Sequence, residues 1–78
     1  MACENEAKAG VKFCFEITPT NVNDVSLTVN GSAVVPDTLT DIGGGVWEVC
    51  IAAVDMVAPG PLVATEGETE LYCAKIVP

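Results

Sequence analysis

The stretch VSLTVNGSAVV, residues 25–35, decides the fold class of this chain. Its first five residues alternate apolar with polar side chains, and this period of two is typical of a half-buried β-strand. Asn30 and Gly31 follow, and this dipeptide favours a type I′ turn because both central positions of such a turn need a positive φ. Residues 32–35 then form the return strand, which Pro36 ends. The segment therefore predicts an antiparallel β-hairpin.

The same period of two recurs along the chain. Further strands are predicted at residues 11–18, 38–40, 46–53, 62–64 and 70–77. Residues 52–58 suit at most a helical turn, because Pro59 follows directly. Many short strands separated by turns predict an all-β sandwich or barrel, and the 78 residues are enough for a single domain over residues 1–78.

The composition narrows the range of partners. Half of the residues are hydrophobic, which excludes the low-hydrophobicity signature of a disordered chain. Eleven acidic residues against three lysines give a net charge of −8, which disfavours nucleic acid and anionic membranes as partners. No apolar run approaches the roughly 20 residues that cross a bilayer. The first ten residues also lack the basic and apolar regions of a secretion signal. We therefore expect protein partners.

Four cysteines, Cys3, Cys14, Cys50 and Cys73, are the strongest covalent signal. They form no CxxC pair, and histidine is absent, so the usual zinc spacings are missing. Cys14 and Cys50 both fall on the outer face of predicted strands, so they would form a disulfide if those strands are neighbours. Cys3 would then pair with Cys73. Four cysteines allow three connectivities, and four free thiols in a reducing compartment are the alternative.

The sequence offers no catalytic constellation. Serine and cysteine nucleophiles need a base, and the chain has no histidine. The glycine run at residues 43–45 is followed by neither a helix nor a lysine, so it is a turn and not a phosphate-binding loop. We therefore expect a protein that is not an enzyme, and the loop APGP at residues 58–61 would be the one contact point of an inhibitor.

Calcium is the cofactor alternative that the sequence leaves open. Four aspartates in or near predicted loops could supply carboxylate oxygens to calcium: Asp24, Asp37, Asp41 and Asp55. The D-x-D-x-D-G pattern of a calcium loop is missing, so no cofactor is expected. Phe13, Phe15 and Trp47 alternate with polar neighbours, which predicts that they lie in the core and do not form an exposed sugar-binding surface.

Residues 25–53 resemble bacterial immunoglobulin-like domains, over roughly a third of the chain. The glycine-aromatic-hydrophobic pattern of that family is carried here by Gly45, Trp47, Val49 and Ile51. The resemblance implies a small immunoglobulin-like antiparallel β-sandwich without catalytic residues. Such domains occur as adhesion or spacer modules on bacterial surfaces, and on tailed-phage virions as capsid decoration proteins.

Three features favour the virion setting: a start at Met1, no secretion signal, and a single domain instead of a tandem array. The expectation is a non-catalytic structural protein that decorates or cements a capsid, with a cell-surface or secreted adhesion module as the alternative. Its contacts with capsid protein or with further copies are expected at the chain ends, through Met1, Ala2, Glu4, Lys75, Ile76, Val77 and Pro78. The acidic turn at residues 66–70 is expected to face solvent or a basic partner.

Overall fold

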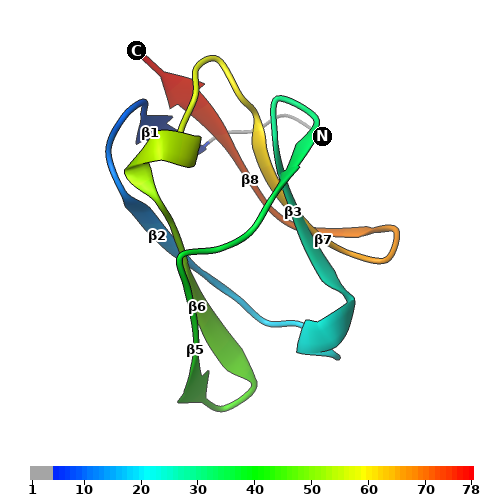
Figure 1. Ribbon diagram of the computed structural model, residues 1–78. Helices are drawn as coiled ribbons and strands as arrows, with labels where there is room; N and C mark the ends of the chain where they lie inside the picture. The colour runs from blue at the N-terminus through cyan, green and yellow to red at the C-terminus, as the bar shows by residue number, and fades with distance from the viewer. Residues whose placement is uncertain (1–4) are drawn as a thin grey trace.

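The computed structural model describes residues 5–78, and these residues form two packed β-sheets (Figure 1). The strands are β1 (Asn5–Lys8), β2 (Phe13–Ile17), β3 (Val25–Val29), β4 (Ser32–Val34), β5 (Thr38–Gly43), β6 (Val46–Ile51), β7 (Leu62–Glu66) and β8 (Thr69–Val77). Two single-turn 3₁₀ helices, η1 (Val22–Asp24) and η2 (Ala53–Asp55), interrupt the connections, and no α-helix occurs within residues 5–78.

The strand order is that of an immunoglobulin-like sandwich. One sheet has the order β1-β8-β7-β3-β4 and the other β2-β6-β5. In the lettering of that fold, β2, β6 and β5 occupy the positions of strands B, E and D, while β3, β7 and β8 occupy those of C, F and G. All pairings are antiparallel except that of β1 with β8, which is parallel. The predicted small immunoglobulin-like β-sandwich is therefore confirmed.

The hairpin predicted from Asn30 and Gly31 is present between β3 and β4. Asn30 has φ 56° and Gly31 has φ 79°, so both central residues adopt the positive φ that a type I′ turn requires. Leu27 pairs with Val34 and Val29 with Ser32 across the turn. The turn fixes the register, and the register places Leu27 and Val29 in the core.

Strand β5 is longer than the sequence pattern predicts. The predicted strand ends at residue 40, whereas β5 continues to Gly43. An Asp41 carboxylate oxygen accepts the N–H of Gly43 at 2.9 Å, and the pairing with β6 shifts register between these two residues. The strand therefore passes through a β-bulge between Asp41 and Gly43 before it enters the glycine turn. All six residues of β5 are exposed.

The core lies between the two sheets. Its fully buried side chains of largest volume are Ile51, Leu62, Ile76 and Val49. Phe15 of β2 stacks on Tyr72 of β8 with ring centroids 4.4 Å apart, which joins the two sheets. Phe15 is buried, and Phe13 and Trp47 pack partly buried against the core. The three aromatic residues predicted to be internal therefore lie in or against the core.

The loop at residues 58–61 runs against β8. The carbonyl of Pro59 accepts the N–H of Ile76 at 3.0 Å. Gly60 has φ +80°, and a Cβ added there would lie 3.2 Å from Cγ1 and from the backbone nitrogen of Ile76. The loop is therefore held against a central strand, which does not suit the projecting contact of an inhibitor.

Gly60→Ala is expected to lower the free energy of unfolding by about 1–3 kcal/mol, since alanine disfavours a positive φ and its methyl group meets Ile76. Gly67→Ala is the matched control, because Gly67 also has a positive φ, +60°, but faces open space. Urea unfolding of both variants measures the difference. Equal losses would show that the contact with Ile76 contributes nothing.

Candidate functional site

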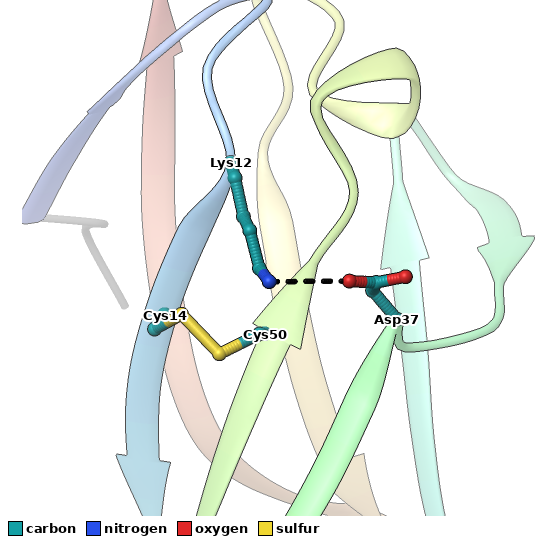
Figure 2. The surroundings of a disulfide bond; sticks show 4 residues. All are labelled: Lys12, Cys14, Asp37 and Cys50. Carbon is teal, nitrogen blue, oxygen red and sulfur yellow. Dashed lines mark ion pairs between the residues drawn. A yellow bond between two sulfur atoms is a disulfide. The ribbon is translucent and has the colours of Figure 1, made fainter.

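The outer face of the β2-β6-β5 sheet carries a disulfide between Cys14 and Cys50 (Figure 2). The two residues lie directly opposite each other on β2 and β6, with their Cα atoms 4.0 Å apart. The predicted Cys14–Cys50 bond on the outer face is confirmed. It joins two strands of one sheet, whereas the disulfide of antibody domains crosses the core between sheets.

The second predicted disulfide stays a prediction. Cys73 lies on β8 and is buried. Its proposed partner, Cys3, lies outside the described residues, as do the interface candidates Met1, Ala2 and Glu4.

The C-terminal interface candidates do not form an edge. Strand β8 pairs with β1 on one side and with β7 on the other, so its backbone cannot accept a further strand. Ile76 is fully buried in the core, and its side chain is unable to contact a partner in this fold. Lys75 and Pro78 are exposed and Val77 is half-buried, so these three remain candidates for side-chain contacts.

The aspartates considered for calcium lie apart. Asp37 forms an ion pair with Lys12 at 3.2 Å beside the disulfide (Figure 2), and Asp41 binds the backbone of its own turn. Within residues 5–78, no group of three or more histidine, cysteine, aspartate or glutamate side chains is placed to hold a metal ion. The Lys12–Asp37 pair is about half exposed on both sides, so it contributes at most about 1 kcal/mol.

The acidic turn between β7 and β8 has a structural role at one of its glutamates. The carboxylate of Glu66 accepts the backbone N–H groups of Thr20 and Asn21, in the loop that leads into η1. The expectation was that this turn faces solvent or a basic partner, and Glu66 in addition contacts a loop of its own chain. The expectation holds for Glu68, which is exposed. Sequence spacing could not reveal the contact, because the bonded residues are 46 and 45 positions apart.

Glu66→Ala is expected to lower the free energy of unfolding by about 1–2 kcal/mol, because two backbone donors lose a charged acceptor. Glu66→Gln keeps one acceptor oxygen and should lose roughly half as much. Urea unfolding tests both, with Glu68→Ala as the control for the charge change. A Glu68→Ala effect as large as that of Glu66→Ala would mean that net charge, not the bonds to the loop, accounts for the loss.

An apolar groove opens on the side of the sandwich where β4 and β5 form the edges of the two sheets. Its volume is about 310 Å³. The lining is almost entirely apolar and comprises Val22, Val25, Ser26, Leu27, Ala33, Val34, Val35, Pro36, Leu39 and Val49. Figure 1 shows the segment after β4 crossing from one sheet to the other to reach β5, and Val35 and Pro36 of this segment line the groove.

Large hydrophobic side chains are exposed around this groove. Val35 and Leu39, which line it, are 81% and 41% exposed. A cluster of exposed apolar side chains beside an apolar groove is typical of a protein-interaction surface. The sequence reasoning missed this surface, although the apolar residues on both sides of Pro36 were a signal that could have found it.

Tyr72 is the only described group whose ionisation the fold clearly alters. Burial raises the pKa of its hydroxyl. The ring lies in the aromatic stack with Phe15, so this shift belongs to core packing and not to a reactive site.

The chain matches no protein-family model, no curated protein and no solved structure. Within residues 5–78, no helix has the length and apolar character needed to span a membrane.

Proposed function

We propose that this protein is a non-catalytic structural protein that binds other proteins in a larger assembly, and more specifically a decoration or cement protein of a phage capsid. The observation that carries the proposal is the open side of the sandwich, where all residues of edge strand β5 are exposed beside an apolar groove. Exposed strand edges and apolar patches are the features through which β-proteins bind protein partners.

The disulfide supports a location outside a reducing cytoplasm. Bonds such as Cys14–Cys50 persist in oxidising surroundings, including virion and cell surfaces. A capsid protein is made in the host cytoplasm and would acquire this bond after release. The resemblance of residues 25–53 to bacterial immunoglobulin-like domains supports the same setting.

A cell-surface or secreted adhesion module is the second candidate, because the disulfide suits that location equally well. A protein ligand fits this candidate better than a glycan does. Glycan sites present exposed aromatic rings, whereas Phe13, Phe15 and Trp47 pack in or against the core.

Light scattering of the purified chain in native buffer, with and without reductant, tests the choice between the two candidates. A defined trimer or larger oligomer is expected for a decoration protein, since such proteins pack around a symmetry axis. A monodisperse monomer that keeps its fold would count against the decoration proposal and favour the adhesion module.

A further inference from the structure

Strand β5 has one paired edge and one open edge. It bonds to β6 on one side, and it is the last strand of the β2-β6-β5 sheet among the described residues. Every second residue of an edge strand directs its N–H and C=O away from the sheet, which leaves these groups ready to pair with another extended chain.

We propose that β5 binds an extended segment of a partner protein as an additional strand of this sheet, and that the segment alternates apolar residues with lysine or arginine. This inference rests on the proposed function, because it names the site and the chemistry through which the protein joins an assembly. Recognition of this type uses backbone hydrogen bonds for affinity and side-chain pockets for specificity.

The groove distinguishes β5 from the other edge of the same sheet. Strand β2 is that other edge, but its inward side chains Phe15 and Ile17 are already buried under the opposite sheet. No residue of β2 lines the apolar groove. Beside β5, the inward side chains of an added strand meet the groove lined by Leu39 and Val34.

The size of the groove suits side chains of a peptide. Its volume of about 310 Å³ lies at the lower limit for small-molecule sites. Because side chains on one face of a strand repeat every second residue, a few apolar side chains from one bound strand would enter it. This accounts for the apolar half of the proposed alternation.

The negative charge on the outer face of the sheet accounts for the lysine or arginine residues of the proposed segment. Glu16 and Glu48 lie directly opposite each other on β2 and β6, and Thr40 of β5 pairs with Glu48 on its other side. The Glu48 carboxylate therefore lies one strand away from β5 on this face, and the Glu16 carboxylate lies two strands away. An added strand would lie about 10 Å from β6, within reach of a lysine or arginine side chain that extends over Thr40.

The same charges disfavour a second copy of this chain as the bound strand. Each copy carries a net charge of −8, and its lysine nearest to β5, Lys12, is already paired with Asp37. Two β5 edges in contact would bring the Asp41 carboxylates of both copies into one sheet without a cation between them. The acidic face is complementary to a basic segment of a different protein.

The test uses a synthetic peptide of alternating lysine and valine, blocked at both ends, titrated into the disulfide-bonded protein and followed by amide NMR shifts. We expect saturable shifts that centre on residues 38–43. A peptide of alternating glutamate and valine should not bind. A lysine-valine peptide with proline at a central valine position should bind about tenfold more weakly, since proline cannot donate a strand hydrogen bond.

Two pairs of variants keep the test decisive. Glu48→Lys should weaken binding of the lysine-valine peptide about tenfold, because it places a positive charge beside the peptide lysines. It should not destabilise the fold, because it replaces the like-charge pair of Glu16 and Glu48 with a pair of opposite charges. Glu68→Lys makes the same change of charge on an exposed turn and should leave binding unchanged. Leu39→Ser should weaken binding through the groove, whereas Val54→Ser, at a residue outside the groove lining, should not.

Equal binding of the acidic and basic peptides, shifts centred on β2 instead of β5, or no binding of either peptide would overturn the inference. Light scattering tests the proposed function separately from the proposed partner strand. An oligomer whose β5 amides are protected before any peptide is added would support the structural role while overturning the basic partner strand. A monomer that binds the basic peptide at β5 would support the partner strand while counting against the decoration proposal.

Discussion

Cys14→Ala/Cys50→Ala is expected to lower the free energy of unfolding by about 4 kcal/mol. The bond closes a loop between residues 36 positions apart, and the chain-entropy model gives a loss of this size for such a loop. Domains of this length are stable by roughly 4–12 kcal/mol, so the loss is a large part of the whole. The midpoint temperature of thermal unfolding should fall by on the order of 20 °C, and calorimetry measures this shift.

The reduced wild-type protein is the control for this variant. Because reduction also opens the disulfide of Cys73, reduced wild type is compared with the reduced variant, and these two samples should unfold within a few degrees of each other. An unfolding temperature that stays within a few degrees of the oxidised wild type in both samples would show that the sheet alone holds β2 against β6.

Leu62→Ala is expected to lower the free energy of unfolding by roughly 3–5 kcal/mol. Leu62 lies on β7, which pairs on both sides within the five-stranded sheet, and its side chain is fully buried. The substitution removes apolar surface from the core and leaves a cavity that two well-paired neighbouring strands cannot close. Urea unfolding of the disulfide-bonded protein measures the loss.

Val54→Ala is the matched control, because Val54 in η2 is 83% exposed and its truncation should change stability by less than about 0.5 kcal/mol. Should Leu62→Ala prove no worse than this control, β7 would not be a central core strand, and the sheet order given above would need revision. A variant too unstable to fold agrees with the prediction.

The local sequence pattern was sufficient to predict the structure wherever residues close in sequence determine it. The alternation at residues 25–29 and the turn at Asn30-Gly31 together predict a hairpin whose register the structure reproduces. The alternation around Cys14 and Cys50 placed both sulfurs on an outer face, which made the bond predictable once two strands were assumed to be neighbours. The extent of β5 was not predicted, because its last residues pair with β6 through a register shift between Asp41 and Gly43, which simple alternation does not reveal.

The two ends of the chain occupy different places in the five-stranded sheet. Both ends were contact candidates; the N-terminal strand β1 lies at an edge, whereas β1 and β7 flank the C-terminal strand β8, in which Ile76 is buried. The free edge with the groove is instead β5, in the middle of the chain. Edge or centre is a property of sheet order, and sheet order depends on which distant strands pair.

The sequence by itself determined an all-β fold, with inward Phe15, an outward Cys14 and a strong acidic charge, because period, turn residues and charge are local quantities. Only the tertiary structure decided that Glu66 binds the loop at Thr20, that Ile76 is core, and that β5 lies open beside an apolar groove. These features arise from the pairing of strands far apart in the chain. Hydrophobic alternation specifies which face of a strand is buried, but it does not specify which strand lies beside it.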